Sequence, residues 1–175
     1  MTCQPPLRKD ATVDEHASSE PRWLGEREAR AWRGYTRMRI ELEAALSRRL
    51  ARGPGLSHAD YAVLVELSEA PEGRLRAFQL GRALRWEKSR LSHHLKRMEA
   101  RGLVCRENCA EDGRGSEVML TGAGRATIEA AAPAHVEDVR ALMIDHLAPE
   151  QLDALADISE VVLAALAAEE GDGCS

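Results

Sequence analysis

The 175-residue sequence has few aromatic residues: three Trp, two Tyr and one Phe. A core formed by this chain must therefore consist mainly of Leu, Ala, Val, Ile and Met. Leu and Ala favour helices, and the residues that favour strands are sparse. With 44% hydrophobic and 30% charged residues, the composition predicts one soluble, mainly helical domain with extended arms.

Long apolar runs are missing as well. No window approaches the roughly 18 consecutive apolar residues of a membrane-spanning helix. Residues 1–22 lack the apolar stretch of a secretory signal. These two absences predict a cytoplasmic location.

The sequence also lacks the common catalytic and metal-binding motifs. It has no C-x-x-C pair, and Cys105 and Cys109 have no matching His or Cys pair to complete a zinc site. Cys3 and Cys174 lie near the ends, and all four thiols are expected to be reduced in the cytoplasm. There is no G-x-x-x-x-G-K-[ST], H-E-x-x-H or G-x-S-x-G motif. We therefore expect no enzyme, no cofactor and no metal.

The net charge of −5 conceals an uneven distribution. Residues 1–73 carry 11 basic and 12 acidic residues, residues 74–125 carry 12 and 6, and residues 126–175 carry 1 and 11. The middle segment is therefore +6 and the last one −10. A concentrated basic segment is typical of a nucleic-acid-binding element, although a merely solvated surface gives the same pattern.

Helical periodicity appears on both sides of the basic segment. From Trp23 to about Arg52 an apolar residue recurs every three or four positions: Trp32, Tyr35, Met38, Leu42, Ala45, Leu46 and Leu50. Ser57 and Asp60 resemble a capping box for a second helix, whose buried face would be Tyr61, Leu64, Val65 and Leu67. A third, kinked or interrupted at Pro133, is expected from Thr121 to about His146. A last helix from Pro149 to about Ala168 carries the stripe Leu152, Leu155, Ile158, Val162 and Leu166.

The basic segment itself predicts short elements. Residues 74–76 can add a stub of strand, and a compact helix over 77–84 would place Phe78, Leu80 and Leu84 in the core. A further helix over about 87–101 would end at Gly102, with Trp86 before it as a packing anchor. Strands over 103–109 and 116–120 would form a hairpin around the polar loop 110–115.

The helix over 87–101 has two contrasting faces. Leu91, Leu95 and Met98 lie on one side, and the opposite side carries Ser89, His93, Lys96 and Arg97, flanked by Arg90 and Ser92. Every side chain on this outer face can donate a hydrogen bond or carry positive charge, whereas a solvated helix more often includes Glu and Asp. The order of elements predicts a winged helix-turn-helix, mainly α with a small β-hairpin, whose outer helix face enters the major groove of DNA.

Each basic or polar residue then has an expected role. Ser89, Arg90 and His93 lie near the helix N-terminus and are best placed to contact base edges. Phosphate contacts are expected from Ser92, Lys96, Arg97 and Arg74. In the hairpin loop, Arg114 lies between two glycines and would reach the minor groove or a phosphate, with Asp112 holding it or capping the turn. A plain surface turn is the alternative for this loop.

Two stretches resemble the MarR-type (multiple antibiotic resistance) regulators. Residues 112–124, DGRGSEVMLTGAG, are similar to the wing signature D-x-R followed by V-x-L-T-x-x-G. Residues 91–104, LSHHLKRMEARGLV, are similar to the recognition helix and its exit, with Met98 where Leu is usual. The resemblance extends from about Trp23 to Leu166. It implies a homodimer with interleaved terminal helices, a palindromic double-stranded DNA operator, and often a small-molecule or oxidant signal. The region of the first helix lacks the cysteine of the peroxide-sensing members.

These inferences together define the expected organisation. The first and last helices carry apolar stripes that the small central domain cannot obviously cover, which favours a homodimer, with packing inside one chain as the alternative. The expected segments are a disordered arm (1–21), an N-terminal dimerisation helix (22–55), the winged helix-turn-helix domain (56–121), C-terminal dimerisation helices (122–168) and a disordered tail (169–175).

Two kinds of signal are candidates for control. A small aromatic or anionic effector could bind near Trp32, Tyr35, Arg39, His58 and Tyr61, although core packing explains Trp32 and Tyr35 about as well. The alternative is a thiol-based redox sensor that uses Cys105 or Cys109. Four residues along a strand separate these two by about 13 Å, too far for a direct disulfide, which leaves a bridge between molecules as an open alternative.

Overall fold

The computed structural model describes residues 21–108 and 116–172. Its elements are α1 (Glu26–Arg52), α2 (His58–Glu69), the 3₁₀ turn η1 (Pro71–Gly73), β1 (Arg74–Arg76), α3 (Ala77–Leu84), α4 (Lys88–Ala100), β2 (Val104–Asn108), β3 (Ser116–Leu120), α5 (Gly122–Leu142), the 3₁₀ turn η2 (Ile144–His146) and α6 (Pro149–Asp172). The chain divides into two compact units between Thr36 and Arg37. This boundary lies inside α1. Within the described ranges, no helix has both the length and the hydropathy needed to cross a bilayer.

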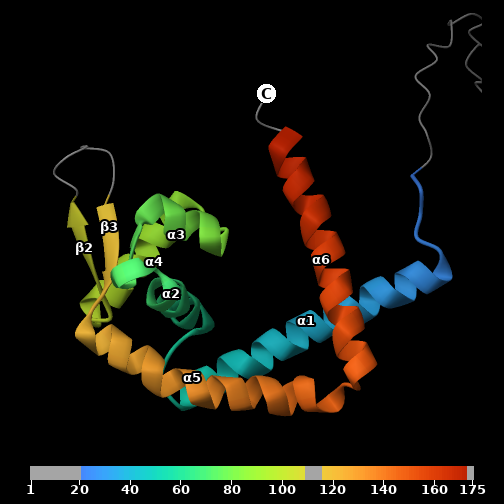
Figure 1. The fold of residues 1–175 in the computed structure, drawn as a ribbon, viewed down its shortest axis with the longest axis horizontal. Helices are drawn as coiled ribbons and strands as arrows, with labels where there is room; N and C mark the ends of the chain where they lie inside the picture. The colour runs from blue at the N-terminus through green and yellow to red at the C-terminus, as the bar shows by residue number, and fades with distance from the viewer. Residues whose placement is uncertain (1–20, 109–115, 173–175) are drawn as a thin grey trace, which may run out of the picture. The chain divides into compact units, whose positions relative to one another are not determined.

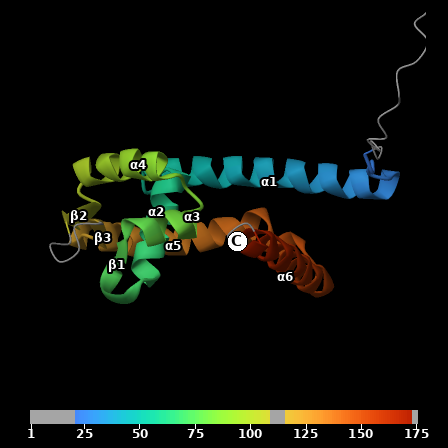
Figure 2. The ribbon, with the colours of Figure 1, turned by 90° about the horizontal axis from the view of Figure 1, so that it is seen from above.

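The three strands form one small antiparallel sheet in the order β1-β3-β2. The expected stub β1 pairs with β3 so that Leu75 lies opposite Val118, and β2 pairs with β3 so that Cys105 lies opposite Met119. Figure 1 shows α2, α3 and α4 grouped beside β2 and β3, and Figure 2 shows the same group from above. The predicted winged helix-turn-helix arrangement is confirmed.

The core of this domain is aliphatic, as the composition requires. Its buried members come from every element of the group: Leu56, Val63, Leu64, Leu67, Leu80, Leu91, Leu95, Met98, Leu103, Val104, Val118, Ile128 and Ala131. The prediction for Phe78 was wrong, because its side chain is 60% exposed while Leu80 takes the buried position on α3. The expected face of α2 was also shifted, since Val63 is fully buried whereas Tyr61 and Val65 lie at the rim of the core.

Local capping explains where several elements begin and end. The Ser57 hydroxyl accepts from the Asp60 N–H, and the Asp60 carboxylate accepts from the Ser57 N–H, which confirms the capping box of α2. The Thr121 hydroxyl caps α5 by accepting from the Gly124 N–H at 2.9 Å. Gly102 follows α4 with a φ of 70°, as expected for the glycine after a helix end.

The C-terminal helices differ from the sequence prediction in two respects. First, α5 runs without interruption through Pro133 but ends at Leu142, where Met143 leaves the helical region with a φ of −140°. The turn η2 then folds back on α5, because Arg140 pairs with Asp145 at 2.7 Å and the His146 ring donates to the Ala141 carbonyl. Second, α6 continues beyond Ala168 to Asp172, so residues 169–172 are helical where a disordered tail was expected.

Candidate nucleic-acid interface

One buried face and two tight turns position α4. Leu91, His94, Leu95 and Met98 are buried. Before the helix, Arg85 adopts a left-handed φ of 53°, and the Trp86 N–H donates to the Gly81 carbonyl at 2.9 Å. A Cβ at Gly81 would lie 3.4 Å from the Trp86 carbonyl, so a small residue lets α3 approach this turn closely. The outward face of α4 is therefore set by packing on the opposite side.

The outward face of α4 is exposed along its whole length. The exposed side chains are Ser89, Arg90, Ser92, His93, Lys96 and Arg97, all of them predicted. Lys88 is exposed beside them in the first turn and was missed by the sequence analysis, although its position four residues before Ser92 could have indicated it. The structure thus gathers the predicted donors and cations of α4 on one surface.

Carboxylates divide the basic residues of the domain into two groups. Arg101 pairs with Asp60, Arg106 with Glu99, and Arg74 with both Glu72 and Glu117. Within residues 21–108 and 116–172, by contrast, no ion pair involves Lys88, Arg90, Lys96 or Arg97. Arginines paired in this way stabilise the fold, whereas the cations of α4 keep their charge available for an anionic partner.

Arg90 rests on the aromatic ring that precedes the helix. Its guanidinium carbon lies 4.4 Å from the centre of the Trp86 ring, within the range of a cation–π contact. The edge of the same ring contacts His94, with ring centres 5.2 Å apart. Trp86 packs against the hydrophobic core and so acts as the expected anchor. This contact limits the freedom of Arg90 without removing its charge.

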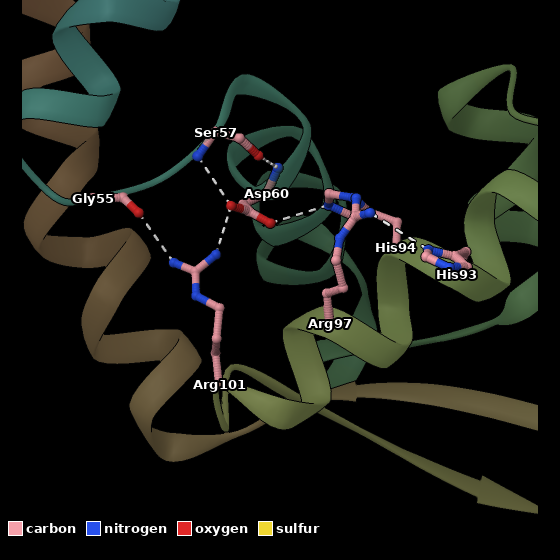
Figure 3. A network of polar contacts seen from close by, with 7 residues as sticks. All are labelled: Gly55, Ser57, Asp60, His93, His94, Arg97 and Arg101. Carbon is pink, nitrogen blue, oxygen red and sulfur yellow. Dashed lines mark hydrogen bonds and ion pairs between the residues drawn. The ribbon is translucent and has the colours of Figure 1, made fainter.

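A buried polar cluster lies behind the exposed face of α4. Asp60, at the start of α2, accepts from the Ser57 N–H at 2.9 Å and from Arg101 Nη1 at 2.7 Å, and its other oxygen lies 3.1 Å from His94 Nε2. Arg101 also donates to the Gly55 carbonyl. On the far side of the His94 ring, Nδ1 lies 2.8 Å from Arg97 Nη2. Figure 3 shows this chain of contacts from Arg101 through Asp60 and His94 to Arg97 and His93.

Burial and hydrogen bonding act on the two titratable groups of this cluster. Burial alone would raise the pKa of Asp60, but hydrogen bonds from Ser57 and Arg101 outweigh it and the pKa of this carboxyl is lowered. Burial lowers the pKa of His94, and the positive charges of Arg97 and Arg90 add to this effect, while Asp60 opposes it. Asp60 is therefore ionised and His94 neutral at pH 7.

In the sequence, Asp60 is recognisable only as a helix cap and His94 only as the neighbour of His93. Pattern rules could not reveal the cluster, because Asp60 and Arg101 are 41 positions apart in the sequence. The capping box does give one local signal, since its carboxylate must lie at the buried start of α2.

The structure describes the two strands of the wing, β2 and β3, whereas the tip of the wing lies outside the described residues. Asp112, Arg114 and Cys109 belong to the segment 109–115, which is not described. At the base of the wing, Arg74 Nε lies 3.3 Å from Glu72 Oε2, and Arg74 Nη1 lies 3.6 Å from Glu117 Oε2. Arg74 therefore joins β1 to β3, and this pairing competes with the phosphate contact predicted for it.

The five candidate effector residues are spread over both compact units. Trp32 and Tyr35 belong to the first unit, where their rings lie 5.9 Å apart and both remain more than half exposed. In the second unit Arg39 faces Glu43 at 3.8 Å, His58 is exposed, and the Tyr61 ring packs on His135 with centres 4.3 Å apart. The Nδ1 atom of His135 is buried and has no hydrogen-bond partner among the described residues. His135 was not among the predicted residues.

The described part of the chain shows little that would support metal or thiol chemistry. It contains no cluster of three or more His, Cys, Asp or Glu residues suited to a metal ion. Cys105 is a half-buried free thiol on β2, and its Sγ lies 3.9 Å from the Met119 carbonyl. The polar surface of α4 is the feature in these ranges that is best suited to bind a partner.

Comparison with known proteins identifies similar chains. The sequence pattern of the MarR family matches residues 55–115. The solved structure of AbsC, a MarR family transcriptional regulator from Streptomyces coelicolor, is 40% identical, with a TM-score of 0.80 over 85% of this chain and 99% of that one. Sco3205 from the same organism, a MarR family transcriptional regulator solved in complex with DNA, gives the same identity and TM-score over 85% of this chain and 92% of its own. Bordetella bronchiseptica BpsR, whose DNA binding is regulated by 6-hydroxynicotinic acid, is 20% identical with a TM-score of 0.66 over 76% of this chain and 98% of that one, and shows a similar fold.

Proposed function

The chain belongs to the MarR family of DNA-binding transcriptional regulators, which are not enzymes, and from this premise we propose that it is a cytoplasmic homodimer that binds a palindromic DNA operator. One recognition helix of each subunit, α4, enters the major groove, and the wing arginine lies at the minor groove. The dimer represses transcription and is released by a small aromatic or anionic ligand.

The observation that carries this proposal is the composition of the outward face of α4. That face consists of hydrogen-bond donors and cations, and none of its cations forms an ion pair within the described ranges. The DNA major groove accepts a single α-helix and offers base acceptors along its floor and phosphates along its walls. A helix that is held by one apolar face and carries only donors on the other suits this partner.

The residues of the interface take two roles in the proposal. Ser89, Arg90 and His93 contact base edges, because the N-terminal half of a recognition helix lies deepest in the groove. Lys96, Arg97 and Ser92 contact phosphates, as does Lys88, which the structure adds to the set. Arg114 reaches into the minor groove from the wing with the support of Asp112. Arg74 contributes less than the others because Glu72 and Glu117 already compete for its charge.

Unsatisfied apolar surface supports the homodimer. On α6, Ile158, Val162 and Leu166 follow one helical stripe and are each more than half exposed. On α1, Trp32, Tyr35 and Met38 are also exposed. The two helices carry opposite charge: residues 149–169 contain five carboxylates and no Lys or Arg, whereas residues 26–52 contain eight Arg and four Glu. Apolar stripes with opposite flanking charges favour pairing between two copies of the chain.

The effector part of the proposal is supported by the environment of Tyr61. Its ring packs against that of His135 at a tilt of 43°, and the buried Nδ1 of His135 lacks a partner in the described ranges. Buried polar atoms of this kind are uncommon in folded proteins. A carboxylate or hydroxyl of a small aromatic ligand could satisfy it. Arg39 and His58 belong to the same compact unit as Tyr61, whereas Trp32 and Tyr35 stay candidates from the sequence alone. The regulation of BpsR by 6-hydroxynicotinic acid is a precedent of matching chemistry.

Binding to duplex DNA over a salt series tests the central claim. We expect the purified protein to bind DNA from its own upstream region, with the logarithm of the affinity falling linearly as the logarithm of the salt concentration rises. The joint Lys96→Ala and Arg97→Ala variant should abolish specific binding and make any residual slope shallower, by roughly 0.9 per lost phosphate contact. The joint Arg48→Ala and Arg52→Ala variant removes two exposed charges of α1, outside the winged domain, and serves as the control. A flat salt response, or equal losses in the two variants, would refute the proposal.

A redox-sensing regulator is the second candidate, and it depends on the free thiol of Cys105. Oxidation of this half-buried side chain would add volume and polarity between β2 and β3, where its Sγ contacts the Met119 carbonyl. If oxidation releases DNA and Cys105→Ser prevents the release, this candidate replaces the ligand-controlled one. If oxidation has no effect on DNA binding, a sensing role for Cys105 is excluded.

A further inference from the structure

Asp60 and His94 are the two buried polar or charged residues in the described part of the chain, each with about 5% of its surface exposed. They lie opposite each other, one at the start of α2 and the other on the inner face of α4. An isolated pair of this kind contributes less to stability than well-packed apolar residues of similar size often do. The contacts of Asp60 and His94 therefore point to a role beyond stability.

The hydrogen-bond chemistry of the pair fixes the position of a proton. A guanidinium can only donate, so the 2.8 Å contact between Arg97 Nη2 and His94 Nδ1 requires Nδ1 to be an acceptor. The proton of the neutral ring then belongs on Nε2, which faces the Asp60 carboxylate at 3.1 Å. That N–H lies away from the ideal line to the carboxylate and has no other partner in the described ranges. The tautomer thus follows from two partners, one on each side of the ring.

Asp60 is itself held from two further sides. Its Oδ2 accepts from the Ser57 N–H and from Arg101 Nη1, whose guanidinium also reaches the Gly55 carbonyl. The carboxylate is therefore fixed at the start of α2 before it meets the ring. The buried middle of this chain of contacts is Asp60 and His94, and one of its exposed ends is the guanidinium of Arg97 (Figure 3).

We propose that Asp60 and His94 are positioning residues for DNA binding: Asp60 fixes the His94 tautomer whose Nδ1 holds the Arg97 guanidinium at the edge of the interface. Arg97 then contacts phosphate in a preset orientation. It therefore loses less side-chain conformational entropy on binding than a mobile arginine would. This inference rests on the proposed function, because it assumes that α4 contacts DNA.

Protonation of His94 would break the hydrogen bond between its Nδ1 and the Arg97 guanidinium. Once Nδ1 carries a proton it can no longer accept from Arg97, and two positive groups would face each other at hydrogen-bond distance. The charged groups that face the ring are Asp60 from α2 and Arg97 and Arg90 from α4, while Trp86 presents only its edge. Arg101 acts on the ring only through Asp60. The hold on Arg97 should therefore be present at neutral pH and lost in acid.

The decisive experiment compares operator affinities of matched variants at two pH values. His94→Gln keeps an amide donor that can reach Asp60 but has no atom at the place of Nδ1, whereas His94→Asn puts an amide oxygen close to that place. We expect His94→Gln to bind about three- to tenfold more weakly than wild type near pH 7.5, and His94→Asn to bind within about twofold of wild type. At a pH low enough for nitrogen NMR to show that the His94 ring is protonated, the ratio of the dissociation constants of His94→Gln and wild type should fall to about one, because the wild-type contact is then lost as well. Taking the ratio cancels the titration of groups that contact neither His94 nor Arg97.

A double-mutant cycle separates action through Arg97 from damage to the fold. In an Arg97→Gln background, His94→Gln should change the affinity by less than about twofold. Nitrogen NMR of the histidine rings, recorded without DNA, should show His94 protonated at Nε2 in the wild type and a mixture of tautomers in Asp60→Asn. These readouts would not move in this way if His94 served only to fill the core.

Each outcome decides the inference. The inference is overturned if the ratio of the dissociation constants of His94→Gln and wild type does not change when His94 becomes protonated, or if His94→Gln and His94→Asn weaken binding equally. It is also overturned if His94→Gln costs as much affinity in the Arg97→Gln background as in the wild type, or if the wild-type ring carries its proton on Nδ1. If the wild type binds the operator normally, such a result leaves the proposed function intact. If the wild type fails to bind any duplex, both the proposed function and this inference are wrong.

Discussion

Gly124 is the position at which the smallest substitution should have the largest structural effect. A Cβ added there would lie 2.0 Å from the Leu103 carbonyl oxygen and 3.0 Å from its carbon. The obstacle is backbone and cannot rotate away. The first turn of α5 therefore approaches the exit of α4 so closely that only glycine fits. We predict that Gly124→Ala strongly destabilises the winged domain.

The size of the effect follows from the contacts at this junction. An ordinary contact needs about 3.4 Å, so α5 must withdraw by about 1.4 Å, the difference from 2.0 Å. That movement disrupts the bonds from the Thr121 N–H and hydroxyl to the Leu103 carbonyl, now 3.2 and 3.1 Å long. Overpacking costs about 1–3 kcal/mol, and each lost hydrogen bond costs about 0.5–1.5 kcal/mol. The higher helix propensity of alanine offsets up to about 1 kcal/mol of this destabilisation. These contributions together span about 1–6 kcal/mol, and we expect a net loss near the middle of that range, about 2–4 kcal/mol.

Urea and thermal unfolding at a fixed protein concentration measure this loss, since the stability of a dimer depends on concentration. The midpoint of thermal unfolding should fall by about 5–15 °C. The control is Gly122→Ala in the same helical turn, where an added Cβ meets no atom within 4 Å; its stability should change by less than about 0.5 kcal/mol. Equal stability of the two variants would show that the junction is looser than its geometry implies, and would refute the reasoning.

Three further predictions concern the buried carboxylate, the dimer and the wing. Because the pKa of Asp60 is lowered on folding, its contribution to stability is present above the unfolded pKa near 3.8 and is lost as the pH falls through the lower folded value. Asp60→Asn should be about 1–3 kcal/mol less stable than wild type at pH 7 and should lose less stability in acid. An acid unfolding profile equal to that of wild type would contradict this. Leu166→Asp should convert the dimer to monomers in sedimentation experiments, whereas Ala164→Asp on the opposite face of α6 should not; retention of the dimer by Leu166→Asp would argue against that interface. Arg114→Ala should abolish specific operator binding while leaving the unfolding midpoint within about 1 °C, and an unchanged operator affinity would exclude a role for the wing tip.

The sequence predicted the elements well wherever a local rule applied. The capping box of Ser57 and Asp60, the glycine after α4, the Thr121 cap and the alternation of faces on α4 each depend on residues within about four positions of one another. Such signals are encoded locally, and the structure confirms them. The outward residues of α4 follow from the same periodicity, because once one side of a helix is buried the other is fixed.

Predictions that needed packing partners were less reliable. Phe78 is as apolar as Leu80, and only the position of α2 and α4 against α3 decides which of the two is buried. The end of α5 at Leu142 depends on a turn held by Arg140 and Asp145, and no strong breaker in the sequence marks it. α6 extends beyond the predicted end near Ala168 to Asp172.

Sequence alone determined the class of fold, the helix proposed to bear the interface and the donors on its surface, because each of these depends on composition and on a repeat of 3.6 residues. Tertiary structure alone decided which cations are held by carboxylates and which are available, and it alone brought Asp60 against His94. The physical reason is range: charge pairing and burial act between groups that are close in space, and folding places close together residues that the chain keeps tens of positions apart.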